Sequence, residues 1–70
     1  MTTYLKTFIY EGANGLKVSV SQTLEKYARA AFWRVDFCHV YKGVEYWYTY
    51  KTGLLNKPNK RQIQTYLETL

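Results

Sequence analysis

The chain has 70 residues and a formal net charge of +5, from ten Lys and Arg against five Asp and Glu. This length allows one small domain, residues 1–70, with too little core to enclose an enzyme cleft. A hydrophobic share of 47% argues against a disordered chain, and the basic balance excludes an acidic mimic of nucleic acid.

The cysteine count and the distribution of apolar residues also indicate where in the cell the protein is located. The one cysteine, Cys38, permits no internal disulfide. The first residues lack the basic start and apolar run of a signal peptide, and no apolar stretch nears the roughly 20 residues that span a bilayer. We therefore expect a cytoplasmic protein without membrane contact, in the host cytoplasm if the protein is viral.

Residues 4–20 predict a β-hairpin. Asn14-Gly15 tolerates the positive φ angles of a hairpin turn, and polar and apolar residues alternate on both sides of it. One face of this hairpin is expected to carry Leu5, Ile9, Leu16, Val18 and Val20. The opposite face is expected to carry Tyr4, Lys6, Phe8, Tyr10 and Lys17.

Residues 22–33 have the periodicity of an amphipathic helix. Ser21 is a candidate N-cap, and Ser19 with Gln22 is a rival with capping-box spacing. The apolar positions follow the i, i+3, i+4, i+7, i+8 pattern, at Leu24, Tyr27, Ala28, Ala31 and Phe32.

A second hairpin is predicted from Val35 to Tyr50, turning at Lys42-Gly43. A two-residue loop pairs Tyr41 with Val44, His39 with Tyr46 and Phe37 with Tyr48. One face then carries Val35, Phe37, His39, Tyr41, Val44, Tyr46, Tyr48 and Tyr50. Its large apolar area favours burial against the helices, and an exposed binding face is the alternative.

The last helix is predicted after Pro58, a residue that fits the first turn of a helix. Apolar residues then recur at helical spacing, at Ile63, Tyr66, Leu67 and Leu70. The element order is therefore β-β-α-β-β-α. We expect an α+β fold, with the two hairpins in one antiparallel or mixed sheet and two helices packed on one face.

The strongest functional signal is a run of cations around the start of the last helix: Lys51, Lys57, Lys60 and Arg61. No acidic residue occurs between Glu45 and Glu68. Cations at a helix N-terminus oppose the helix dipole by about 0.3–1 kcal/mol each. Because free backbone N–H groups at the same end suit a phosphate, the pattern predicts an anion-binding cradle, and a solvated basic loop is the alternative. Dispersal of these cations, or their pairing with carboxylates, would contradict the prediction.

The first hairpin is expected to extend this track, with Lys6 and Lys17 as cations and Phe8 and Tyr10 as stacking platforms for bases. Cys38 and His39 are neighbours in a strand and point to opposite faces, so they form no catalytic pair. No His or Cys cluster has metal-ligand spacing. We expect no enzyme, no metal and no cofactor.

These patterns favour a non-enzymatic nucleic-acid-binding protein, for DNA or RNA, that contacts mainly the phosphate backbone. The expected contact residues are Lys51, Lys57, Asn59, Lys60, Arg61, Lys6, Lys17, Phe8 and Tyr10. A short, basic, tyrosine-rich composition is typical of regulatory proteins of phages, plasmids or archaeal viruses.

Two other hypotheses remain open. The first is a viral inhibitor that binds a host nuclease, polymerase or defence complex, because Tyr and Trp are common interface anchors. The second is a homodimer formed through a sheet edge or the tyrosine-rich face.

Overall fold

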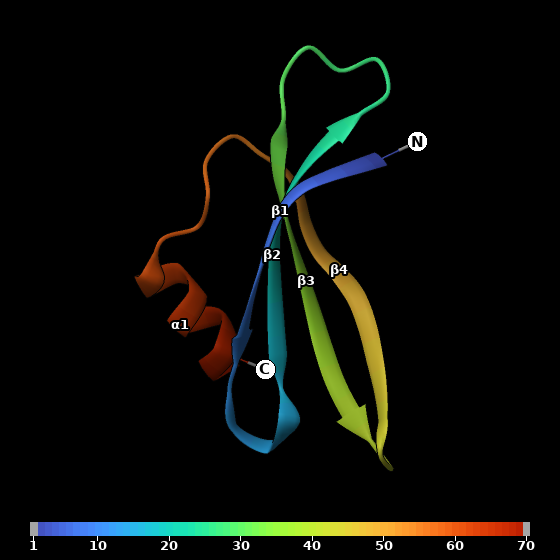
Figure 1. The fold of residues 1–70 in the computed structure, drawn as a ribbon. Helices are drawn as coiled ribbons and strands as arrows, with labels where there is room; N and C mark the ends of the chain where they lie inside the picture. Colours follow the sequence, from blue (N-terminus) through green and yellow to red (C-terminus); the bar gives the residue numbers. More distant parts are fainter. Residues whose placement is uncertain (1, 70) are drawn as a thin grey trace.

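The computed structural model describes residues 2–69, which form a four-stranded sheet and one long helix (Figure 1). The strands are β1 (Thr2–Glu11), β2 (Lys17–Glu25), β3 (Phe32–Tyr41) and β4 (Val44–Leu54). They lie in the order β1-β2-β3-β4, and each pairs antiparallel with the next. A 3-10 turn, η1 (Ala13–Gly15), joins β1 to β2, and α1 (Lys60–Thr69) follows β4. The predicted α+β class and single antiparallel sheet are confirmed, but the element order is β-β-β-β-α.

The helix predicted at residues 22–33 is wrong. β2 continues through Glu25, and residues 26–31 connect it to β3. Val20 lies between Phe8 of β1 and Val35 of β3, so β2 has hydrogen-bonded neighbours on both sides. An isolated helix of about 12 residues is only marginally stable in water. The ladders on both edges of β2 therefore outweigh the helical periodicity.

The faces predicted for the first hairpin are also wrong. The loop between β1 and β2 spans five residues, Gly12 to Leu16, which pairs Phe8 with Val20 and Ile9 with Ser19. Changing the register by one residue moves every side chain of a strand to the other face. Phe8 and Tyr10 consequently share a face with Val18 and Val20, whereas Ile9 and Lys17 lie on the opposite face.

The second hairpin has the predicted turn and register. Tyr41 pairs with Val44, His39 with Tyr46 and Phe37 with Tyr48. Lys42 and Gly43 have φ angles of 52° and 77°, the left-handed pair that suits a two-residue hairpin turn.

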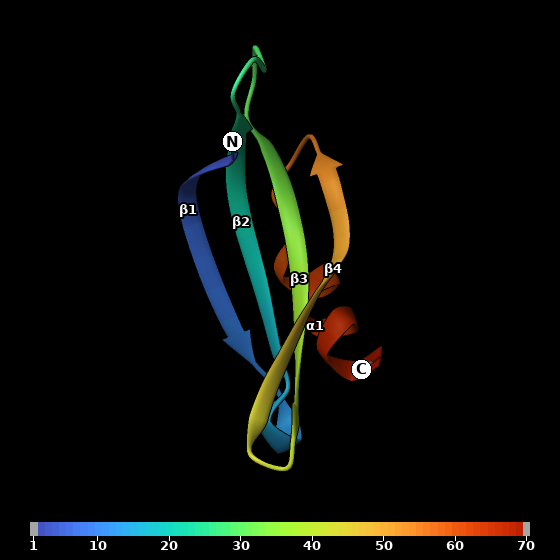
Figure 2. The same cartoon turned by 90° about the vertical axis from the view of Figure 1, so that its right-hand side faces the viewer.

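Helix α1 lies across one face of the sheet (Figures 1 and 2), which we call the helix side. The core forms there, from Val18, Val20, Val35, Phe37 and Ile63. We call the opposite face the open side, because no element within residues 2–69 covers it (Figure 2). No helix in the described chain is long and apolar enough to cross a membrane.

Candidate functional site

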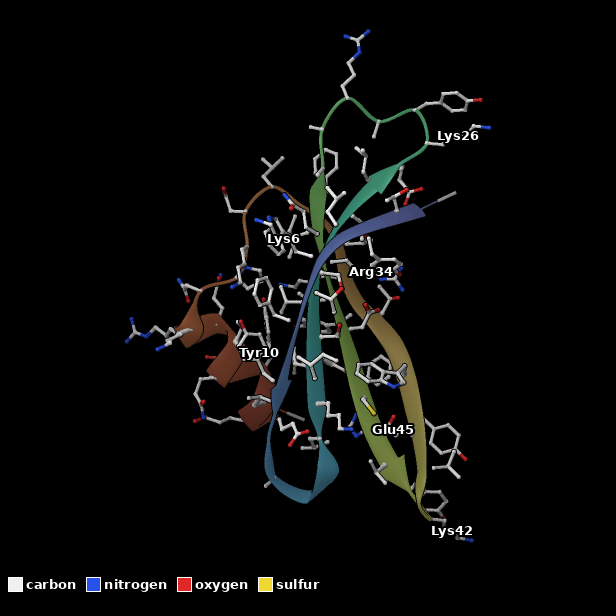
Figure 3. The ribbon with its side chains drawn as sticks, in the orientation of Figure 1. Lys6, Tyr10, Lys26, Arg34, Lys42 and Glu45 are labelled. Carbon is white, nitrogen blue, oxygen red and sulfur yellow. The ribbon has the colours of Figure 1, made fainter. Side chains whose placement is uncertain are left out.

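Lys57 and Phe8 meet on the helix side. The connector before α1 places the Lys57 Nζ 3.9 Å from the centre of the Phe8 ring, a cation–π contact. The Phe8 ring also stacks on Trp33, with ring centres 6.5 Å apart. Lys6 lies on the same side of β1, facing the connector (Figure 3). The predicted association of Lys6 and Phe8 with the cationic stretch is therefore present, but Phe8 already contacts Lys57 and Trp33.

Lys51 and Lys57 line one groove, between the end of β4 and the first turns of α1. The groove has a volume of about 260 Å³, and its floor includes Pro58, Gln62 and Tyr66. No carboxylate lines it. The Lys51 Nζ lies 5.4 Å from the centre of the Tyr50 ring, so it is held over an aromatic surface. This groove is the strongest anion-binding candidate among the predicted residues.

Lys60 and Arg61 line a second groove, on the side of α1 that faces β1. This groove has a volume of about 660 Å³ and also contains Tyr10 and Glu11. The first turn of α1 thus divides the four predicted cations into two pairs. Glu11 lines this groove, but the strand register directs its side chain to the opposite face, near Lys17.

Tyr10 does not serve as a free stacking platform. Its side chain is only partly exposed and packs against the core formed by the central strands and α1 (Figure 3). The register explains this position, since Tyr10 lies opposite the fully buried Val18. The predicted stacking role of Tyr10 is therefore not supported by its packing.

Asn59 caps α1. Its side-chain Oδ1 accepts a hydrogen bond from the Gln62 backbone N–H at 2.9 Å, and the Asn59 N–H donates to Gln62 Oε1 at 3.0 Å. This reciprocal pair is a capping box, with Asn in the place of Ser or Thr. It occupies one N–H group that the sequence prediction left free for a phosphate, and it engages the Asn59 side chain. Fewer backbone N–H groups at this helix end are therefore free to bind a phosphate than the sequence predicted.

Lys17 lies on the open side, where it forms an ion pair with Glu45. The hydrogen bond and charge of Glu45 raise the pKa of Lys17, and the same contacts with Lys17 lower the pKa of Glu45. Lys17 is thus occupied by a carboxylate of its own chain and is separated from Phe8 and Tyr10 by the sheet. Its predicted place in the cationic track is wrong.

A second ion pair lies on the open side. Arg34 Nε is 3.0 Å from both carboxylate oxygens of Asp36, and Arg34 Nη2 donates to the Thr49 hydroxyl at 2.6 Å. By the strand registers, Glu11 lies on this side as well. The registers also place Glu25 there, so the strands carry two cations against four carboxylates on the open side, a net charge of −2.

The helix side has the opposite balance. Five cations lie on it or at the start of α1: Lys6, Lys51, Lys57, Lys60 and Arg61. Neither of the two ion pairs in the described part of the chain includes any of them. The fold therefore separates the paired charges from most of the excess positive charge.

The sequence prediction favoured burial of the β4 tyrosines against the helices and kept an exposed binding face as the alternative. Tyr46, Tyr48 and Tyr50 are 53%, 45% and 45% exposed, although their neighbour Phe37 is buried. We call these three residues the tyrosine strip. Strand alternation predicts that the three tyrosines share one face. Only the structure shows that α1 leaves them partly exposed.

Cys38 and His39 point to opposite faces, as predicted. Cys38 is fully buried, and burial raises the pKa of its thiol. His39 shares a hydrogen bond with the Tyr48 hydroxyl, at 3.0 Å from Nε2. Within residues 2–69, no group of three His, Cys, Asp or Glu side chains is placed to hold a metal ion.

Comparison of the chain with protein-family models, with curated proteins and with solved structures finds no match in any of the three.

Proposed function

We propose that this protein is a non-enzymatic nucleic-acid-binding domain that holds backbone phosphates on its helix side. One observation carries the proposal: five cations gather there outside the ion pairs of the described chain, whereas both ion pairs lie on the open side. A basic surface of this kind attracts polyanions, and the free energy comes mainly from release of counterions. We propose that the protein has a regulatory role in the cytoplasm, and that this is the host cytoplasm if the protein is viral.

The groove of Lys51 and Lys57 is the proposed centre of phosphate binding, because no carboxylate lines it. Lys6 extends the surface along β1, and Lys60 and Arg61 extend it along α1. We assign Lys60 and Arg61 a smaller part because they line a different groove from Lys51 and Lys57.

The test compares two double variants of equal charge change. Lys51→Gln with Lys57→Gln removes the proposed centre, and Lys26→Gln with Arg29→Gln removes two cations from the β2–β3 connection, which does not line the groove (Figure 3). Binding to duplex and single-stranded oligonucleotides is measured by fluorescence anisotropy at several salt concentrations. For duplex DNA, the slope of log K against log[salt] should shrink by about 0.9 for each lost phosphate contact.

We expect the first double variant to lose affinity and slope, and the second to change little. Equal losses in both variants would show that binding depends on net charge and not on this groove. No binding by the unmodified protein at low salt, to DNA or RNA in either form, would end the proposal.

A protein-binding function is the second candidate, as an inhibitor of a host nuclease, polymerase or defence complex. The open side favours it, because Trp47 is 44% exposed there and Ile9 is 57% exposed, and both types of side chain suit a protein interface. A pull-down from host lysate with and without nuclease treatment separates the two candidates. A partner that is retained after nuclease treatment supports the protein-binding function.

A further inference from the structure

We infer that the tyrosine strip stacks unpaired bases, so that the preferred ligand is a single-stranded nucleic acid. This inference rests on the proposed function and specifies its ligand class. It begins with the shape of the β3–β4 hairpin, whose tip extends beyond α1 in both views (Figures 1 and 2). The helix side of β4 is therefore uncovered near the tip, where Tyr46 and Tyr48 lie.

Neighbouring side chains hold two rings of the strip in place, those of Tyr48 and Tyr50. Buried Phe37 meets Tyr48 edge-on, with ring centres 5.7 Å apart, and stacks on Tyr50 at 4.4 Å. His39 hydrogen-bonds Tyr48, and their rings lie within 5° of parallel. Rings that are already ordered lose little conformational freedom when a ligand binds.

The two tyrosines nearer the hairpin tip, Tyr46 and Tyr48, are the ones whose rings can stack on a base. Tyr50 is sandwiched against Phe37 and has Lys51 beside its ring. Tyr46 is 53% exposed, and Tyr48 meets Phe37 only through an edge-on contact. We therefore assign base stacking to Tyr46 and Tyr48, with His39 as a supporting ring.

Charge around the strip selects a polyanion over a neutral or acidic partner. Lys42 lies at the tip of the hairpin (Figure 3) and Lys51 at the inner end of the strip. The one carboxylate of β4, Glu45, lies on the open side in its ion pair with Lys17. A strand that passes along β4 therefore meets cations at both ends of the strip and no carboxylate of β4 between them.

The strip continues into the phosphate groove. Tyr50 contacts Tyr66 of α1 with ring centres 5.5 Å apart, and Tyr66 lines the groove that contains Lys51 and Lys57. The path joins aromatic rings near the tip to cations near α1. Successive strand residues on one face lie about 6.8 Å apart, which suits bases that are splayed and not stacked on one another. A duplex keeps its bases stacked inside and cannot present them to these rings.

The experiment measures binding to an oligothymidine and to a duplex of equal charge, for three forms of the protein. Tyr46→Ala with Tyr48→Ala removes the free rings, and Trp47→Ala removes an aromatic ring of the same strand from the open side. Circular dichroism and thermal unfolding check that each variant folds. Tyr46→Ala alone replaces the double variant if that variant is unfolded, because Tyr46 is 53% exposed.

We expect the double tyrosine variant to bind oligothymidine about 10-fold or more weakly, because one stacked base raises affinity about 5- to 150-fold. Its duplex affinity should stay within about twofold, and Trp47→Ala should retain single-strand binding. Unchanged single-strand affinity in the double variant, or an equal loss in Trp47→Ala, overturns this inference and leaves phosphate binding intact. If the unmodified protein binds neither ligand at low salt, the proposed function fails together with the inference.

Discussion

The helix side and the open side of the sheet are made by the same four strands, yet their chemistry differs. The helix side combines the buried core with exposed tyrosines and cations outside the ion pairs of the described chain. On the open side, Lys17 and Arg34 are paired with carboxylates, and small hydroxyl side chains such as Ser19 and Ser21 fill the middle. Strand alternation alone sends successive residues to these two environments.

The difference shows how a small domain can be stable and still present a charged surface. Lys17 and Arg34 are neutralised where the sheet faces solvent without a helix. The remaining cations lie around α1, where a polyanion can approach grooves formed by the helix and the sheet. The predictions below test this contrast, starting with the largest expected effect.

Truncating a buried side chain on the helix side of the second hairpin should lower the free energy of unfolding more than truncating a side chain on the open side. Phe37→Ala empties a site that is 3% exposed, and we expect a loss of about 3–5 kcal/mol in the free energy of unfolding. Trp47→Ala, on the open side, should cost clearly less because Trp47 is 44% exposed. Urea unfolding followed by circular dichroism measures both.

Since a domain this small rarely has more than about 3–5 kcal/mol of stability, Phe37→Ala is expected to be largely unfolded. Phe37→Leu provides the measurable form, with a loss of up to about 1.5 kcal/mol. If Trp47→Ala is as largely unfolded as Phe37→Ala, the open side is also covered in solution, for example by a second copy of the chain. Light scattering then gives the oligomeric state.

Two cations near the start of α1 should have opposite effects on stability. Lys57→Gln removes the contact with Phe8 and should lower the free energy of unfolding by about 0.5–1 kcal/mol. Lys60→Gln removes a charge from the first position of α1 and should raise it by about 0.3–1 kcal/mol, because the helix dipole disfavours a cation there.

Both variants lose one positive charge, so each is the control for the other. The same urea titration at low ionic strength measures them. Changes of the same sign would mean that net charge, and not the local contact of each cation, determines the stability of this region.

The smallest effect is expected from the ion pair on the open side. Lys17 lowers the pKa of Glu45 below its usual 4.5, so the pair stabilises the folded protein above that pH. The contribution is lost as the pH falls through the lowered folded-state pKa, when Glu45 becomes protonated. Glu45→Gln should therefore flatten the acid side of the curve of melting temperature against pH.

Glu68→Gln is the matched control, since Glu68 accepts a hydrogen bond from Gln64 and belongs to neither ion pair of the described chain. Curves that coincide for the unmodified protein and Glu45→Gln would show that exposure to solvent screens the pair completely. The same pair also raises the pKa of Lys17, so its contribution should persist to alkaline pH and be lost only above the usual 10.5.

Some elements of this fold follow from local sequence signals. Lys42-Gly43 specifies a two-residue turn, and that turn sets the register of the second hairpin from Tyr41–Val44 as far as Asp36–Thr49. The last helix follows from Pro58 and the spacing of Ile63, Tyr66 and Leu67. These signals are local because a turn or a helix start depends on the φ angles and hydrogen bonds of neighbouring residues.

Other features were decided only when distant segments came together. Residues 22–33 have a helical apolar period, but residues 22–25 become part of β2 because β1 and β3 hydrogen-bond to both edges of that strand. The registers of β2 with β3 and of β3 with β4 put Lys17 beside Glu45, a residue 28 positions away. Composition and spacing along the chain determined the charge, the aromatic content and the local turns. Which cations are paired and which tyrosines stay exposed depended on the tertiary structure, because both require knowing what lies across the sheet and where α1 ends.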